Sequence, residues 1–261
     1  MISIACQIAR EAGRLIHDHF GRSQEIKHSE AHDVKLQMDV SCQRLIESRL
    51  RRAFPDHAIV GEEGDLGEPD AECRWIVDPI DGTVNYSYGI PHFCVSLALQ
   101  HRSSEGDLAR AMGGYAVRVG VIYDPLRDEI FTAEEGKGAF LNGEQIHVSQ
   151  RSHFHEAILS VGFSKTKETI ERGLHDFQIL VHQARKLRMM GSAALDLAYV
   201  AAGRMEAYIE SRVRLWDIAA GVLLVKEAGG HVRLRPIDGM PHAFETVASN
   251  AKLNITSLLH K

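Results

Sequence analysis

The sequence has no long apolar run. A helix that crosses a bilayer needs about 18 consecutive apolar residues, and no stretch of this chain reaches that length. The opening segment carries Arg10, Glu11 and Arg14 inside its apolar pattern, so it lacks the continuous apolar core of a secretion signal. We therefore expect a cytoplasmic protein that does not associate with membranes.

Cysteine is scarce, with 4 residues in 261, and the four are widely separated. They form neither a CxxC pair nor a zinc-binding Cys/His spacing, which indicates buried thiols in a reducing compartment. The 15 histidines include no HExxH motif, and many stand in polar segments, so we interpret those as surface residues.

An excess of positive charge is also absent. The formal net charge is -5, and the densest basic run in the first half is Arg49, Arg51 and Arg52. No broad surface for a phosphate backbone is indicated, so nucleic acid is not expected as a partner. With 44% hydrophobic residues, the chain can bury one large core or two closely packed halves.

Helical spacing of apolar residues predicts a helix from the N-terminus to Gly21 and a second one ended by Pro55. The polar stretch 23–33 between them is interpreted as a loop. From His57 onward, short apolar runs predict strands, listed here by position: 58–61, 75–78, 93–99, 115–123 and 130–133. The alternation of large and small residues in 115–123 gives the clearest strand prediction. We expect the turn at Asp124 and Pro125 to pair this strand with the one at 130–133.

Beyond about residue 150, strand and helix patterns are mixed. Strand-like runs at 157–161 and 187–190 flank a polar helix at 167–184, and a second helical pattern follows Gly191. The result is an α/β plan with antiparallel pieces. No repeat or flexible linker occurs, so we expect a single domain over 1–261, with subdomains of about 1–150 and 151–261.

The string WIVDPIDGT, residues 75–83, places two aspartates three positions apart at the end of an apolar strand. Strand geometry would put Asp78 and Asp81 on opposite faces, so we expect a turn at Pro79 to bring them together. Gly82 and Thr83 then open a segment whose free N–H groups can hold an anion. The alternative is a turn that uses Asp and Gly only for local hydrogen bonds.

Two further acids stand at the ends of patterned segments. Glu62 belongs to a GEEG string that ends a strand, where ligands are often held, although paired glutamates in a loop are usually solvated. Asp217 precedes an apolar helix in LWDIAAG, where an N-cap role is the usual interpretation.

These strings resemble the inositol monophosphatase family, within the superfamily that includes fructose 1,6-bisphosphatases and bisphosphate nucleotidases. The strings GEEG, WIVDPIDGTVNY, GSAALDLAYVAAGRMEAYIE and LWDIAAGVLLVKEAGG occur in the family's order and spacing, and the match covers most of the chain. The resemblance implies a layered αβαβα sandwich, a homodimer and a Mg²⁺-dependent phosphatase acting on small phosphate monoesters.

The resemblance also implies a set of metal ligands. Glu62, Asp78 and the carbonyl of Ile80 would bind one Mg²⁺, Asp78, Asp81 and Asp217 a second, and a weaker third ion would sit near Glu62. Hard oxygen ligands suit Mg²⁺. Two carboxylates about 4 Å apart repel by about 4 kcal/mol at an effective dielectric constant of about 20, so the cluster needs cations.

For catalysis, the family implies direct attack by a water that Glu62 and Thr83 orient or deprotonate, with no phosphoenzyme. The substrate contacts that it implies are Asp81, Gly82, Thr83, Gly191, Ser192, Ala193, Glu210 and Asp217. Glu210 would accept hydrogen bonds from sugar or inositol hydroxyls; alternatively it is an exposed acid that ends a strand at 205–209. Inhibition by lithium is expected by resemblance alone.

Two departures from the family pattern stand out. Leu36 occupies a position where members often have Thr. Asp39 still matches the family, but the sequence does not decide whether the third ion binds or whether Asp39 in this first loop contributes to the site. The segment 102–114 is longer than in short members and indicates an added hairpin loop.

The residues leave the substrate and the class of protein open. Val84, Asn85 and Tyr86 after DGT resemble inositol monophosphatases more than bisphosphate nucleotidases, which implies inositol monophosphate as substrate, with fructose 1,6-bisphosphate or a nucleotide or NADP phosphate as alternatives. A haloacid dehalogenase phosphatase needs its two aspartates at i and i+2, unlike Asp78 and Asp81. A regulatory binding protein without a need for catalysis is the alternative of another class.

Overall fold

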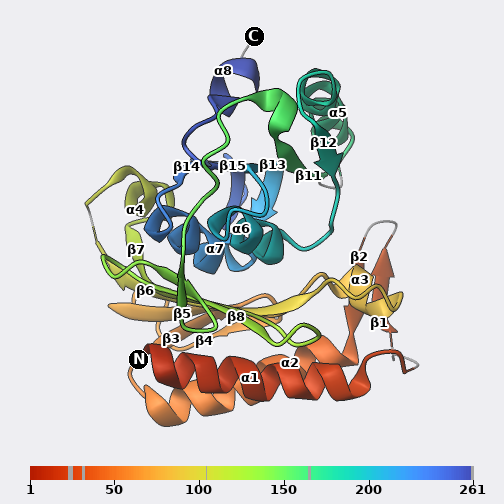
Figure 1. Cartoon of the computed structure of the whole chain (residues 1–261). Helices are drawn as coiled ribbons and strands as arrows, with labels where there is room; N and C mark the ends of the chain where they lie inside the picture. Colours follow the sequence, from red (N-terminus) through yellow and green to blue (C-terminus); the bar gives the residue numbers. More distant parts are fainter. Residues whose placement is uncertain (23–25, 31–32, 104, 164–165, 260–261) are drawn as a thin grey trace.

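The computed structural model describes residues 1–22, 26–30, 33–103, 105–163 and 166–259. Helices and sheets alternate in five layers, as Figure 1 shows from bottom to top, and the expected αβαβα sandwich is confirmed. The helices are α1 (Ile2–His19), α2 (Gln37–Ala53), α3 (Thr83–Ser87), α4 (Asp107–Ala111), α5 (Lys167–Val181), α6 (Ala193–Ala201), α7 (Leu215–Glu227) and α8 (Ile255–Leu259).

The lower layer consists of α1 and α2, whose apolar sides face the first sheet. On α1 the buried residues recur at helical spacing, including Ile8 and Ile16, as the sequence predicts. The loop interpretation of 23–33 is wrong for Ile26–Glu30, which form β1 and pair antiparallel with β2 (Asp33–Leu36). Residues 23–25 and 31–32 lie outside the described residues. The pairing is not visible in the pattern because this polar hairpin has no apolar alternation.

The first sheet has eight strands in the order β10-β9-β8-β7-β6-β5-β3-β4. They are β3 (Ala58–Gly61), β4 (Gly64–Leu66), β5 (Cys73–Asp81), β6 (Cys94–Arg102), β7 (Tyr115–Asp124), β8 (Glu129–Glu134), β9 (Ala139–Leu141) and β10 (Glu144–Ile146). The predicted pairing of β7 with β8 is confirmed. The connection 102–114 joins the antiparallel neighbours β6 and β7 as a hairpin, but it contains α4, which the sequence pattern did not indicate.

The second sheet has five strands in the order β12-β11-β13-β15-β14. They are β11 (Ile158–Gly162), β12 (Lys186–Arg188), β13 (Ala207–Arg214), β14 (His231–Pro236) and β15 (Ala243–Ser249). The pairs of β11 with β12 and β13 are parallel, and the other two are antiparallel. Helices α5 and α8 cover its outer side.

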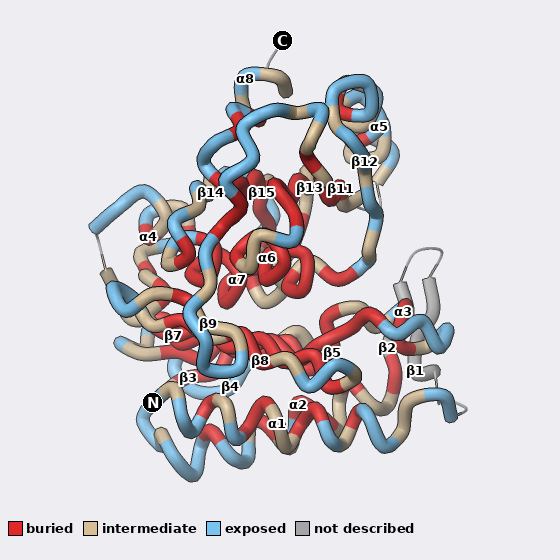
Figure 2. The backbone as a smooth tube through the Cα atoms, in the orientation of Figure 1, coloured by how far each residue is buried: buried red, intermediate tan, exposed pale blue. Residues whose placement is uncertain are grey.

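The middle layer is the most deeply buried part of the molecule. Helices α6 and α7 lie between the two sheets, and Figure 2 shows them largely in the colour of buried residues. The sequences of α6 and α7 are largely apolar on all sides, which fits this position because a helix covered on both sides has no polar face. Gly120 on β7 permits the close approach of α7: a Cβ there would lie 2.8 Å from the carbonyl oxygen of Ala220.

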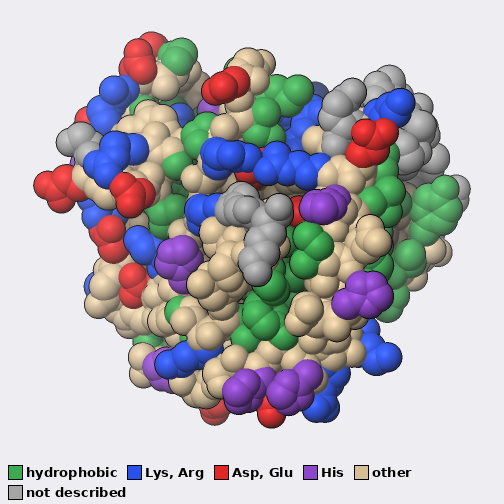
Figure 3. Space-filling model, turned by 90° about the horizontal axis from the view of Figure 1, so that it is seen from above, with side chains coloured by type: hydrophobic (Ala, Val, Ile, Leu, Met, Phe, Trp, Pro, Cys, Tyr) green, Lys and Arg blue, Asp and Glu red, His purple; other side chains and the backbone are tan. Residues whose placement is uncertain are grey.

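The surface on the side of α5 and α8 is mixed in charge. Seen from the side of α5 and α8, basic, acidic and histidine side chains are interspersed, with one short row of Lys and Arg (Figure 3). Among the helices of the described residues, none has both the length and the apolar character required to cross a membrane.

Candidate metal centre

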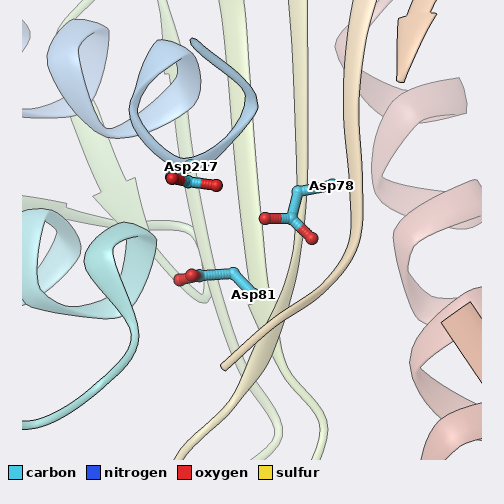
Figure 4. Close-up of side chains that lie close together, drawn as sticks. All are labelled: Asp78, Asp81 and Asp217. Carbon is cyan, nitrogen blue, oxygen red and sulfur yellow. The ribbon is translucent and has the colours of Figure 1, made fainter. Parts of the chain in front are cut away.

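Three aspartates meet between the first sheet and the middle layer. Asp78 and Asp81 come from β5, and Asp217 comes from the first turn of α7. One carboxylate oxygen of each lies within 4.8 Å of the others, and Figure 4 shows the three groups directed into a common space. Among the described residues this is the group of acids, cysteines and histidines whose spacing suits a metal ion.

A β-bulge, and not the expected turn at Pro79, brings Asp78 and Asp81 together. Strand β5 continues through Asp81, with Asp78 opposite Ser96 and Asp81 opposite Cys94 on β6. Three steps on β5 therefore match two steps on β6. The extra residue changes the direction of the following side chain, so two carboxylates at i and i+3 share one face.

The position of Asp217 in the sequence suggests that it is the N-cap of α7, but the structure shows that it is not. The N-cap is Arg214, and Asp217 is the third residue of the helix. Its Oδ2 accepts a hydrogen bond of 2.9 Å from the backbone N–H of Arg214. This contact satisfies a free N–H at the helix start and fixes the direction of the carboxylate.

Asp81 also joins the two halves of the chain. Its Oδ2 accepts hydrogen bonds from the hydroxyl of Ser192 at 2.5 Å and from the backbone N–H of Ala194 at 2.7 Å. Both donors stand at the start of α6; Ser192 belongs to the segment Gly191 to Ala193 that the resemblance assigns to substrate, and Ala194 directly follows it. The expected proximity of that segment to the acids is therefore present.

Burial and mutual repulsion perturb all three carboxyl groups. The pKa of Asp78 is raised well above its ordinary value by burial and then by the charges of Glu62, Asp81 and Asp217. Burial raises the pKa of Asp81 to about 6, against the opposing effect of the Ser192 hydrogen bond. Burial and the charge of Asp81 raise the pKa of Asp217 to about 7. Such a cluster favours a cation, whose charge offsets the repulsion.

Glu62 lies beside this group without belonging to the set of three. It follows the last residue of β3, and its backbone N–H donates to the carbonyl of Val77, the residue before Asp78. Its negative charge contributes to the raised pKa of Asp78. The structure thus places Glu62 next to Asp78, as the strand-end argument anticipates.

The hydroxyl of Thr83 lies within hydrogen-bonding distance of two acceptors. One is the carbonyl of Ile80 at 2.8 Å, and the other is Oδ1 of Asp39 at 3.2 Å. Asp39 also accepts from the backbone N–H of Leu36 at 2.7 Å, and burial raises its pKa to about 7. Leu36 is fully buried, so the residue at the position of the departure points into the core.

Glu210 lies within β13 and not at the end of a strand, so the interpretation of an exposed terminal acid is wrong. Its Oε2 accepts a hydrogen bond of 2.6 Å from the hydroxyl of Tyr208. Burial raises its pKa to about 8, and the charges of Asp217 and Asp196 add to the effect. A bulge between Glu210 and Val213 in the pairing with β15 lets the strand continue past this point.

Sequence reasoning assigned no site role to two residues that contact this region. The side chain of Asn85 on α3 bonds to the carbonyls of His92 and Met190, and the thiol of Cys94 lies 3.7 Å from Asp81 Oδ2. The partners of Asn85 and Cys94 are 7 to 105 residues away, so a local pattern carries no signal for them.

Comparison with known proteins agrees with this geometry. Residues 1–254 match the family described as the inositol monophosphatase family. The chain is 42% identical over 240 residues to the Nus factor SuhB of Pseudomonas aeruginosa, covering 89% of this chain and 84% of the relative. It is 39% identical over 237 residues to inositol monophosphatase 1 of Solanum lycopersicum, covering 88% and 82%.

Solved structures give the same result. The crystal structure of the extragenic suppressor protein suhB of Bartonella henselae superimposes with a TM-score of 0.87 at 32% identity, over 99% of this chain and 98% of the other. The inositol monophosphatase of Thermotoga maritima gives 0.82 at 33% identity, over 98% and 94%. With its layered fold and its acidic cluster, the chain belongs to the inositol monophosphatase family, a family of metal-dependent phosphatases.

Proposed function

We propose that the protein hydrolyses a small phosphate monoester with the help of Mg²⁺, and that inositol monophosphate is its substrate. The observation that carries the proposal is the convergence of Asp78, Asp81 and Asp217 within 4.8 Å of one another. Acids that are 139 residues apart in the sequence meet there although they repel one another. A site for hard cations accounts for this arrangement.

The donor set fits Mg²⁺. All three side chains offer carboxylate oxygens, and Mg²⁺ prefers hard oxygen ligands. We assign Glu62, Asp78 and the carbonyl of Ile80 to one ion and Asp78, Asp81 and Asp217 to a second. A third, weaker ion near Glu62 completes the assignment of two to three ions.

When bound, Mg²⁺ supplies positive charge that offsets the phosphate dianion and lowers the pKa of a water. Glu62 and Thr83 hold this water in line with the phosphorus, and Glu62 accepts its proton. The backbone N–H groups of Gly82 and Thr83 donate to the phosphate oxygens as charge moves onto them. The water oxygen bonds to phosphorus while the bond from phosphorus to the ester oxygen breaks; that oxygen leaves with the bonding pair and takes a proton from solvent to give the alcohol, so no phosphoenzyme forms.

The polar groups opposite the acids suit a polyol. Ser192 and Ala193 stand at the start of α6, and Glu210 presents a carboxyl group from β13. Vicinal hydroxyls can donate to Glu210, and this supports inositol or sugar phosphates as the proposed substrates. The relatives' names include both inositol monophosphatase and fructose 1,6-bisphosphatase, so fructose 1,6-bisphosphate and nucleotide or NADP phosphates are the competing substrates.

A phosphate-release assay over these esters, with and without Mg²⁺, tests the proposal. We expect inositol monophosphate to give the highest kcat/KM and chelation to abolish turnover. Turnover that resists chelation, or an aspartyl-phosphate trapped on Asp78, would show that the mechanism is wrong. Millimolar lithium should inhibit, and insensitivity would remove lithium sensitivity from the proposal.

A regulatory binding role is the second candidate, because several relatives are named Nus factor SuhB. An Asp81→Asn, Asp217→Asn double variant in a strain without the native gene separates the two. Loss of phosphatase activity with full growth would favour the regulatory role. We also propose a cytoplasmic homodimer, which equilibrium sedimentation of the whole chain tests.

A further inference from the structure

Asn85 bridges two segments that flank the candidate site. Its side chain is 9% exposed, and Nδ2 donates to the carbonyl of His92 at 2.8 Å and to that of Met190 at 2.8 Å. The first acceptor precedes β6 and the second lies in the loop 189–192 between β12 and α6. Both N–H groups of the amide are therefore used, one toward each half of the chain.

Two glycines near Asn85, Gly82 and Gly191, have no room for a side chain. Gly191 has φ +80°, and a Cβ on it would lie 3.1 Å from Nδ2 of Asn85. Gly82 has φ +96°, and a Cβ on it would lie 3.0 Å from the carbonyl of His92 and 3.3 Å from that of Gly191. The loop 189–192 thus lies directly against the segment that begins α3, and glycine permits both the left-handed backbone and the contact.

A second tie holds the other end of this loop. Ser192 and Ala194 donate to Oδ2 of Asp81, as described above. Asp81 is a proposed metal ligand, so the strength of this tie depends on the charge of its carboxylate. Asn85 is neutral and is assigned to no metal, so its tie to Met190 does not depend on the metal.

We propose that Asn85 is a positioning residue that fixes the loop 189–192 against Gly82 and Thr83, and so sets the distance between the polyol contacts and the phosphate contacts. The inference rests on the proposed function of Ser192 and Ala193 as substrate contacts. Those two residues come from one half of the chain, while Gly82 and Thr83 come from the other. A small displacement between two parts of a site weakens binding of a substrate that must reach both.

Two substitutions test the tie. Asn85→Asp has nearly the same shape but places carboxylate oxygens against two carbonyls, while Asn85→Ala removes the donors without adding charge. Asn250 supplies a matched control, because its buried Nδ2 also donates to two carbonyls, those of Ser149 and Arg151, at the position directly after the last residue of β15. Asn250→Asp and Asn250→Ala therefore remove the same kind of bridge elsewhere.

We expect both Asn85 variants to raise KM for the phosphate monoester by about tenfold, since two hydrogen bonds are lost, with a smaller effect on kcat. The Mg²⁺ concentration for half-maximal activity should stay within about threefold of the wild-type value, because Asn85 is not a ligand. Hydrogen exchange at the amides of Gly191 to Ala194 should become faster in the Asn85 variants alone. The Asn250 variants should lose thermal stability while keeping KM.

The exchange measurement separates this inference from the proposed function. If the wild-type protein hydrolyses none of the esters, the proposed function fails, and faster exchange in the Asn85 variants still supports the tie. Unchanged exchange in both Asn85 variants would overturn it. Faster exchange with unchanged KM would overturn the positioning role, as would equal kinetic effects of the Asn85 and Asn250 substitutions.

Discussion

The carboxylate of Asp81 accepts a hydrogen bond of 2.5 Å from the hydroxyl of Ser192, which stands 111 residues further along the chain. One oxygen of a proposed metal ligand is thus occupied by the segment that we assign to substrate. The bond lowers the pKa of Asp81 against the effect of burial, so it favours the ionised form that binds a cation. Metal and substrate contacts are linked through this pair.

Replacing Ser192 with Ala should moderately weaken both substrate turnover and Mg²⁺ binding. The variant loses a charge-assisted hydrogen bond worth about 1.5 to 3 kcal/mol, so we expect kcat/KM to fall by roughly 10-fold to 100-fold. The Mg²⁺ dependence of activity should shift to higher concentration, since the pKa of Asp81 rises when the bond is lost. Ser257→Ala, at an exposed hydroxyl in α8, is the control. A Mg²⁺ dependence equal to the wild type would contradict the link.

Asp217→Asn should abolish activity and stabilise the metal-free fold. The amide keeps the shape and an oxygen that can accept from Arg214, but it removes a charge from the cluster. We expect kcat to fall roughly 100-fold or more, because a metal ligand is lost. Above about pH 7 the free energy of unfolding without metal should rise by at least about 1 kcal/mol. Denaturant unfolding in EDTA measures this, with the exposed Asp238→Asn as a control that changes neither quantity.

The stability of the metal-free protein should decrease as the pH rises from about 5 to about 8. The pKa is raised to about 6 for Asp81, about 7 for Asp39 and Asp217, and about 8 for Glu210. Raised values mean that the folded state holds more protons than the unfolded state in this window. Their contribution is complete below the unfolded values near 4 and is lost as the pH passes the folded ones.

Saturating Mg²⁺ should remove most of this pH dependence. The ion binds the deprotonated carboxylates, so its stabilising effect is larger at pH 8 than at pH 5. Thermal unfolding across this range, with Mg²⁺ or with EDTA, measures both effects. Metal-free stability that rises between these limits would mean that the acids are not destabilised by their proximity.

The sequence predicts those parts of the fold that depend on local patterns. The alternation over 115–123 appears as β7, and the apolar string after Leu215 appears as the buried helix α7. The acidic strings also lead to the candidate metal centre, since each acid stands at the boundary of a patterned element. Family resemblance was needed to connect them, because nothing local shows that Asp217 approaches Asp78.

The features that sequence reasoning did not reach depend on pairing between distant segments. The bulge between Asp78 and Asp81 is defined only by the register against β6, which no local spacing reveals. The position of Asn85 likewise depends on Met190, in a loop of the other half. Such contacts arise when the layers pack together, so they are properties of the assembled fold.

Gly162→Ala should impair substrate binding with little loss of stability. A Cβ on Gly162 would overlap the carboxyl group of Glu210, the neighbouring residue on β13. The obstacle is the end of a flexible side chain, so the protein can respond by moving Glu210 while the two strands stay paired. We expect KM for inositol monophosphate to rise by roughly 2-fold to 10-fold, as for loss of an ordinary hydrogen bond, with Tm nearly unchanged.

Gly120→Ala is the contrasting substitution for that experiment. There the new Cβ meets the backbone of Ala220 in α7, which cannot move without displacing the helix that carries Asp217. Overpacking of this kind costs about 1 to 3 kcal/mol, so Tm and kcat should fall together. Equal stability losses in both variants would show that Glu210 does not move aside, and an unchanged KM in Gly162→Ala without such a loss would count against a polyol contact by Glu210. A KM effect that is absent for an ester without vicinal hydroxyls would locate the lost contact at those hydroxyls.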